Sequence, residues 1–168
     1  MKGEQLVQEP SSTTPLFELA GLAPTEGMVA VPEELAGTPP GCFLDAMGMR
    51  LTHIGVGRAR AEMMLTPLHL NQRGGPQGGA LVAFADAVAG WASDGAVPAG
   101  NFATFDLTCH LLSRADAGTT LVAEARPVHI GRRSIVQDVD VFSAADERNA
   151  TRRLMARFTC TQLVLPFR

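Results

Sequence analysis

Residues 69–93 read HLNQRGGPQGGALVAFADAVAGWAS, and they set the architecture of the whole chain. Residues 69–79 contain four glycines and a proline, which indicates a loop because both residue types interrupt regular structure. Residues 80–93 are rich in alanine and other helix formers, so they predict a helix. Asp86 is the only charged residue of that helix, and a helix that is apolar on nearly all sides is typically buried. The stretch therefore predicts a loop followed by one long buried helix.

Extended segments flank this helix. Two are expected before it, at residues 49–57 and 58–66, and four after it, at 102–113, 119–130, 133–143 and 151–165, with turns at 116–118 and 145–149. Within 102–113, strict alternation puts Phe105, Leu107, Cys109 and Leu111 on one face and Thr104, Asp106, Thr108 and His110 on the other. A curved antiparallel sheet wrapped around the helix would bury it, so we expect an α+β fold.

The overall composition is that of one globular domain. A length of 168 residues with 46% hydrophobic and 18% charged residues suits a single core. The net charge of −3 does not call for a nucleic-acid partner. No run is long enough to cross a bilayer, and residues 1–15 lack the apolar region of a signal peptide, so we expect a cytoplasmic protein without a membrane partner.

The first forty residues differ from the rest, because they hold six of the eleven prolines. Proline fixes φ and removes a backbone donor, so this part is expected to be extended, looped or partly disordered, with a short helix near residues 16–22. We place an N-terminal extension at residues 1–41 and the folded domain at 42–168.

The three cysteines, Cys42, Cys109 and Cys160, lie far apart, without the spacing of a zinc site or the even number of a disulfide framework. Cys109 and Cys160 fall in apolar strand-like runs, where we expect buried free thiols. The four histidines show no spacing typical of metal ligands or of a catalytic triad, and we treat them as structural. We expect no metal.

Asp86 is the most informative single residue. An ionised carboxylate in a buried helix is costly unless it is paired or functional, and no Lys or Arg lies three or four residues away. An Asp on a wet edge of the helix, bonded to a neighbouring segment, is the structural alternative.

Gly78 and Gly79 lie where the helix is expected to start, so their N–H groups have no partner within it. With the helix dipole, these donors suit a carbonyl oxygen that becomes an oxyanion. The alternative is that the glycines only let the chain enter a crowded helix. Gly78 and Asp86 are eight residues apart, roughly 12 Å along a helix, so one carbonyl cannot easily touch both in one chain. A two-fold partner with an antiparallel helix would bring them together, which predicts a homodimer if they cooperate.

Two stretches resemble the PaaI-type hotdog thioesterases: residues 69–93, quoted above, and residues 103–133, which read ATFDLTCHLLSRADAGTTLVAEARPVHIGRR. With the final strand, the resemblance covers roughly residues 43–165. It implies the hotdog fold, a curved antiparallel sheet around one long helix. It also implies hydrolysis of an acyl-CoA to free acid and CoA by a homodimer or dimer of dimers, with no cofactor beyond the CoA of the substrate.

The resemblance implies roles for individual positions. Asp86 matches the general base or nucleophile, and Gly78 matches the N–H that binds the thioester oxygen. Asn71 matches the residue that positions the carbonyl or the attacking water. Thr104 lies where related enzymes hold that water beside the carboxylate, although it is equally an ordinary β-branched strand residue.

One position departs from the family pattern, since the His before the paired glycines is Gln77 here. Glutamine forms hydrogen bonds but takes up no proton near neutral pH, so we expect Gln77 to orient groups while Asp86 handles the proton.

The resemblance implies that four residues contact the CoA moiety: Gly79, Gly131, Arg132 and Arg133. Arginine forks suit phosphate oxygens, with a solvated turn as the alternative. The acyl group is expected to be medium-chain or aromatic. Two rival functions remain open, a non-catalytic acyl-CoA sensor and a hotdog dehydratase or hydratase, which would need a His paired with the carboxylate.

Overall fold

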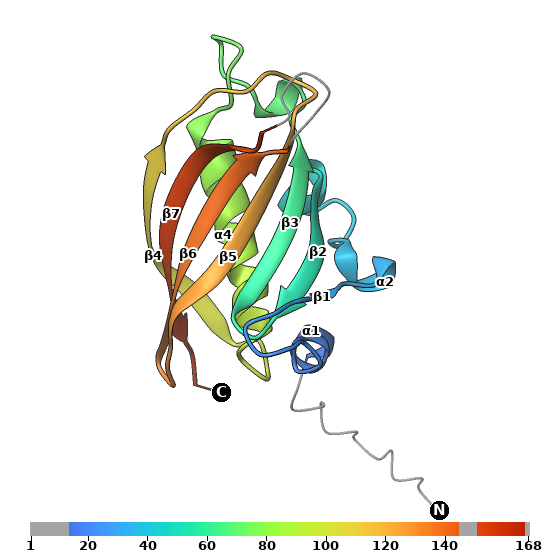
Figure 1. The fold of residues 1–168 in the computed structure, drawn as a ribbon, viewed down its shortest axis with the longest axis vertical. Coiled ribbons are helices and arrows are strands. Elements are labelled where there is room, and N and C mark those ends of the chain that lie inside the picture. The colour runs from blue at the N-terminus through green and yellow to red at the C-terminus, as the bar shows by residue number, and fades with distance from the viewer. Residues whose placement is uncertain (1–13, 145–150, 167–168) are drawn as a thin grey trace, which may run out of the picture.

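A seven-stranded antiparallel sheet wraps around one long helix (Figure 1). The computed structural model describes residues 14–144 and 151–166. The strand order is β1-β2-β3-β5-β6-β7-β4, so the strand that follows the long helix in sequence lies at one edge of the sheet. This arrangement is the one predicted for a hotdog fold.

The expected strands are all present, each within two residues of its predicted ends, and the turn predicted at 145–149 lies outside the described residues. In chain order the elements are α1 (Pro15–Ala20), β1 (Val29–Ala30), α2 (Glu33–Ala36), α3 (Phe43–Ala46), β2 (Met49–Gly55), β3 (Arg58–Met64), the 3-10 helix η1 (Pro67–His69), α4 (Gly78–Asp94), β4 (Phe102–Leu111), β5 (Thr120–Ile130), β6 (Ser134–Ser143) and β7 (Arg153–Val164).

Helix α4 packs one face into the concave side of the sheet (Figure 1). Its buried residues are Ala80, Leu81, Phe84, Ala85, Val88, Ala89, Ala92 and Ser93. The opposite stripe, which includes Asp86, Gly90 and Asp94, stays partly exposed in the single chain, unlike a helix that is covered on all sides. One sheet covers only one side of a helix, so the polar positions of α4 remain reachable.

Residues 14–41 contain α1, β1 and α2, and each of these elements contacts β2. Helix α1 buries Ala20 completely in the core, and β1 pairs with β2 through Val29 and Ile54. A side chain at Gly55 would collide with the carbonyl oxygen of Gly27, so these two segments touch through their backbones. The prolines keep the elements here short, but they do not prevent packing.

The two strand cysteines have different environments. Cys160 on β7 is buried, as predicted, and burial raises the pKa of its thiol to about 12. The prediction for Cys109 is wrong, because this residue is exposed on β4. Its partner across the strand pair is the buried Phe158, so Cys109 faces inward, but β4 is an edge strand that the described part of the chain leaves uncovered.

Among the helices in the described ranges, none is both long enough and apolar enough to cross a membrane.

Candidate active site

The N-terminus of α4 presents backbone donors at the end of the glycine-rich loop. Gln77 is the N-cap residue, its N–H donates to the carbonyl of His69 at 2.8 Å, and its side chain is exposed. Within residues 14–144 and 151–166, the N–H groups of Gly78 and Gly79 donate to no acceptor. A Cβ on Gly79 would meet no atom within 4 Å, so an oxygen can approach this backbone closely. The helix dipole favours negative charge at this point.

Asn71 organises the loop that leads to these donors. Its side-chain Nδ2 donates to the carbonyl of Pro76 at 3.2 Å, and its Oδ1 accepts from the N–H of Arg73 at 2.9 Å. The N–H of Asn71 also donates to the carbonyl of Gly75 at 2.8 Å. The amide therefore has a fixed orientation, with a second Nδ2 hydrogen left for a ligand.

Buried His69 attaches the start of this loop to the body of the domain. Its Nδ1 accepts from the N–H of Thr66 at 2.9 Å, and its Nε2 lies 3.0 Å from the carbonyl oxygen of Met47. A carbonyl only accepts, so Nε2 is the donor in this contact. This is the structural role expected for the histidines.

Asp86 belongs to a short polar network between α4, β4 and β7. The hydroxyl of Thr104 donates to Asp86 Oδ1 at 2.7 Å and lies 3.1 Å from Oε1 of the fully buried Gln162. The Thr104 hydroxyl has one hydrogen, so it cannot donate to both of these oxygens. Nε2 of Gln162 is also buried, without a hydrogen-bond partner among the described residues. Turning the Gln162 amide by half a turn lets Nε2 donate to Thr104, which in turn donates to Asp86. The carboxylate is therefore held in one orientation.

Sequence analysis missed Gln162. Its signal is present in the sequence, because Gln162 occupies an inward position of β7, in register with Phe158 and Cys160, where an apolar residue is the norm. A polar side chain at such a position needs a partner, and Thr104 is the nearest one.

A β-bulge turns Thr104 toward Asp86. Thr104 pairs with Gln162 and Asp106 pairs with Thr161, so Phe105 is an extra residue in β4. Strict alternation predicts Thr104 on the face opposite Leu107, and this prediction is wrong. Both residues oppose buried partners on β7, so both face the helix. Bulges re-aim side chains in this way.

The structure does not bring every predicted site residue together within one chain. Arg132 and Arg133 are exposed in the turn between β5 and β6, and in the described ranges neither forms an ion pair. Gly131, in the same turn, donates its N–H to the carbonyl of Ser134 at 2.9 Å. The carbonyl of Arg133 accepts from Val164, which pairs with Phe102, so the turn lies at the Phe102 end of β4.

The helix N-terminus lies at the other end of β4. A Cβ on Gly78 would come within 3.0 Å of Leu111, the last residue of that strand. Gly78 and Asp86 are separated by eight residues of one helix, roughly 12 Å. Thr104, which contacts Asp86, therefore lies toward the same end of β4 as the Arg132–Arg133 turn, whereas the glycine donors of the same chain lie at the Leu111 end.

An open cavity of about 400 Å³ lies beside Asp86, between α3, α4, β4 and β7. Besides Asp86, Thr104 and Gln162, its lining is mostly apolar or small, and includes Phe43, Leu44, Ala87, Gly90, Trp91 and Phe102. Asp94 is the remaining charged residue of the lining, and burial raises its pKa to about 6. The cavity can hold an apolar group of moderate size next to the Asp86 carboxylate.

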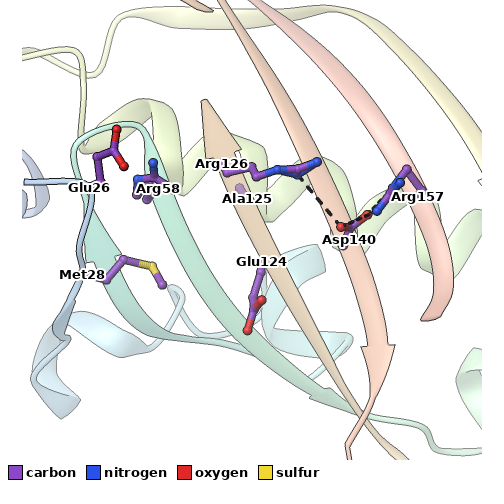
Figure 2. A pocket seen from close by; sticks show the side chains of 8 residues that line it. All are labelled: Glu26, Met28, Arg58, Glu124, Ala125, Arg126, Asp140 and Arg157. Atoms are coloured by element: carbon purple, nitrogen blue, oxygen red, sulfur yellow. Dashed lines mark hydrogen bonds and ion pairs between the residues drawn. The ribbon is translucent and has the colours of Figure 1, made fainter. Parts of the chain in front are cut away.

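A second hollow of about 400 Å³ lies on the outer face of the sheet (Figure 2). Arg157 donates to Asp140 through two hydrogen bonds of 2.6 and 2.8 Å, and Arg126 lies 4.0 Å from the same carboxylate. Opposite charges on neighbouring strands already compensate one another here, so these residues stabilise the sheet surface. Across the described part of the chain, no three His, Cys, Asp or Glu side chains come together as a metal site.

Comparisons with known proteins agree with the hotdog fold. The sequence model of the Thioesterase superfamily matches residues 78–150 of this chain. The PaaI protein from the Escherichia coli phenylacetic acid degradation operon is 23% identical, with a TM-score of 0.62 over 73% of this chain and 83% of that one. A mutant PaaI from Thermus thermophilus is 28% identical, with a TM-score of 0.65 over 73% of this chain and 98% of that one.

A hypothetical thioesterase from Streptococcus pneumoniae, solved with coenzyme A, is 21% identical, with a TM-score of 0.62 over 71% of this chain and 88% of that one. No curated protein matches the sequence significantly.

Proposed function

We propose that this chain is a PaaI-type hotdog thioesterase, and that it hydrolyses an acyl-CoA thioester to a free acid and CoA. The observation that carries the proposal is the Asp86 carboxylate, which accepts a hydrogen bond from Thr104 and lines a largely apolar cavity. The free N–H groups at the start of the same helix supply the second element that acyl transfer needs, a site for the oxyanion.

The proposed reaction begins with the thioester oxygen on the N–H of Gly78 from the partner subunit. Asp86 takes a proton from a water molecule, whose oxygen attacks the carbonyl carbon. The C–S bond then breaks, and the CoA sulfur leaves with the proton. In the variant of the attack step, Asp86 itself attacks the carbonyl carbon, and a water molecule then hydrolyses the resulting acyl–Asp86 anhydride, giving its oxygen and one hydrogen to the free acid and Asp86 and its other proton to the CoA sulfur. Thr104 holds the carboxylate, and Asn71 and Gln77 orient the substrate or water through hydrogen bonds.

The proposed active unit is a homodimer formed through β4. Phe105 and Leu111 on this strand are 71% and 52% exposed, whereas the opposite sheet edge is the two-residue β1. A long apolar edge strand favours pairing with another strand. Antiparallel pairing of β4 with its copy would place the Leu111 end of one chain, with Gly78, beside the Thr104 end of the other, with Asp86.

The same pairing has consequences for the CoA moiety. Arg132 and Arg133 would lie on the chain that supplies Asp86, on the side where the partner supplies Gly78 and Gly79. Exposed guanidinium groups in that place suit the phosphates of the nucleotide. A dimer of dimers is the further assembly expected from the resemblance.

The rival functions have less support. A dehydratase or hydratase would need a His beside the carboxylate, but Asp86 is bonded to Thr104. A non-catalytic sensor remains the second candidate, because Gln77 replaces the proton-accepting His of the family pattern.

Thiol release from a panel of aliphatic and aromatic acyl-CoAs tests the proposed function. We expect turnover of at least one medium-chain or aromatic member by the wild-type protein. Binding of CoA, measured by calorimetry, without thiol release from any member would instead favour the sensor.

Replacing Thr104 with valine removes the hydroxyl at nearly constant volume. A hydrogen bond to a charged group contributes about 1.5–3 kcal/mol, so kcat is expected to fall roughly 10- to 100-fold, with a smaller change in KM. The matched control is Thr104→Ser, which keeps the hydroxyl and should retain most of the activity. Loss of activity in Thr104→Ser, with activity retained in Thr104→Val, would mean that the methyl group, rather than the hydroxyl, is what matters.

A further inference from the structure

The outer side of the edge strand β4 carries two complementary polar side chains, Asp106 and His110. Both are exposed, and they lie four residues apart. Their register partners on β7, Thr161 and Arg157, alternate with buried residues and point away from the helix, so Asp106 and His110 share the outer face of the sheet. In the described part of the chain, neither side chain forms a hydrogen bond or an ion pair.

A row of polar side chains crosses the outer face of the sheet and ends at His110. Asp140 on β6 is the register partner of Arg157 on β7, and Arg157 is the register partner of His110 on β4. Arg157 already donates to Asp140 through hydrogen bonds of 2.6 and 2.8 Å (Figure 2). An imidazole carries at least one N–H in either protonation state, so a carboxylate opposite His110 on a further strand would continue the row.

We propose that two copies of β4 pair antiparallel about Thr108, so that Asp106 of each subunit lies opposite His110 of the other. The pairing rests on the homodimer through β4 in the proposed function. A two-fold axis perpendicular to the sheet places one residue opposite its own copy, and residues at equal distances on its two sides then oppose each other. With Thr108 on the axis, symmetry forms the Asp–His pair twice.

Neighbouring registers give poorer contacts on the outer face. An axis at Asp106 would place two carboxylates directly opposite each other, which is destabilising. An axis at Leu107 or Cys109 would place Asp106 opposite residue 108 or residue 112 of the partner subunit, and neither of these is basic. Among these registers, only the one about Thr108 gives each Asp106 an imidazole partner.

The same register meets the requirement of the shared site. It places Leu111 opposite Phe105 of the partner subunit, so the two large exposed apolar side chains of β4 come to the same level of the interface. Gly78 lies beside Leu111, and Asp86 is bonded to Thr104, the residue before Phe105. Gly78 of one chain therefore comes to the level of Asp86 of the other.

Exchange of the two polar residues tests the pairing. His110→Asp should weaken the dimer at least about tenfold in Kd, because it sets carboxylates opposite each other at two symmetric places. The same substitution puts a carboxylate beside Arg157, so the fold of each subunit should persist. Adding Asp106→His restores both pairs in reverse order, and Kd should return to within about threefold of the wild type. Fluorescence-detected sedimentation velocity over a dilution series measures Kd.

The matched control is His129→Asp, at an exposed histidine on β5, which two strands separate from β4. This variant should keep the Kd of the wild type. An unchanged Kd in His110→Asp, or a double variant as weak as the single one, would overturn the Asp–His pair.

Single cysteines locate the two-fold axis directly. Position 108 lies opposite its own copy, whereas the two copies of position 107, or of position 109, are about 8 Å apart. A disulfide requires Cα atoms within about 7 Å. We therefore expect Thr108→Cys to form a cross-linked dimer on oxidation, in a background with Cys109→Ser. Leu107→Cys in the same background, and the wild-type protein with its exposed Cys109, should not cross-link.

Cross-linking through position 107 or through Cys109 in place of position 108 would overturn the register and keep β4 at the interface. A wild-type monomer, or a dimer that cross-links at none of the three positions, would overturn the pairing of β4 itself. These measurements do not depend on thiol release. A protein that cross-links at position 108 but hydrolyses no acyl-CoA would therefore refute the proposed activity and support the register.

Discussion

Replacing Asp86 with asparagine is expected to lower kcat by about a hundred- to ten-thousandfold, while acyl-CoA binding changes by no more than about threefold. Asparagine keeps the shape of the side chain and an oxygen that can accept from Thr104, so the local structure should persist. It cannot take a proton from water or attack a carbonyl near neutral pH. The loss should therefore lie in kcat rather than in ground-state binding.

Thiol release measures kcat, and isothermal titration calorimetry measures the affinity for a slowly hydrolysed acyl-CoA. Asp116→Asn serves as the control for removal of one negative charge from an exposed site. If Asp86→Asn retained a kcat within tenfold of the wild type, water would have to be activated by another group. If both proteins bound acyl-CoA equally and neither released thiol, the sensor function would gain support.

The second large effect is expected from removal of the Gly78 N–H, the oxyanion donor of a site that two subunits are proposed to share. Gly78→Pro is expected to lower kcat by about 10²–10³-fold, because it removes one oxyanion donor. Proline is tolerated as the first residue of a helix, and the preceding Gln77 already has the extended backbone that proline requires (φ −67°, ψ 130°). The substitution therefore deletes the N–H while helix α4 is expected to stay intact, which far-UV circular dichroism can verify.

Mixing the two inactive variants tests whether the site spans two subunits. A dimer with one Asp86→Asn chain and one Gly78→Pro chain has one site with both defects and one site with none. Random reassociation of equal amounts yields half mixed dimers, so about one quarter of the wild-type activity should return. Each variant reassociated with itself provides the control. If Gly78 and Asp86 acted within one chain, the mixture would stay inactive.

A third variant tests whether β4 forms the interface between the subunits. Replacing exposed Phe105 with arginine should interrupt strand pairing between subunits and yield monomers, because a charge at an apolar interface remains unpaired. The Phe105→Arg monomer should have no thioesterase activity, because the proposed site needs residues from two subunits. Sedimentation velocity separates this outcome from simple unfolding.

The linear pattern of residues was enough to predict the elements of the fold. Alternating apolar residues and the glycine-rich loop at 69–79 predict the strands, the long helix and their order, because these signals are local to each segment. Asp86 also stands out without any coordinates, since it is the only charge in an alanine-rich helix. Local chemistry therefore identifies the candidate carboxylate and the backbone donors at Gly78 and Gly79.

The linear pattern could not predict which face of the sheet Thr104 takes or that Cys109 is exposed, because both depend on pairing between distant strands. Thr104 reaches Asp86 only because β4 has a bulge where it pairs with β7. The residue of β7 that pairs with Thr104 is Gln162, which lies 58 positions further along the chain. Alternation assumes regular pairing, so it placed Thr104 on the opposite face. Cys109 is exposed for a related reason, because the sheet order leaves β4 at an edge. Which face a side chain takes, and whether another strand covers it, depends on contacts between distant segments, and these form only when the chain folds.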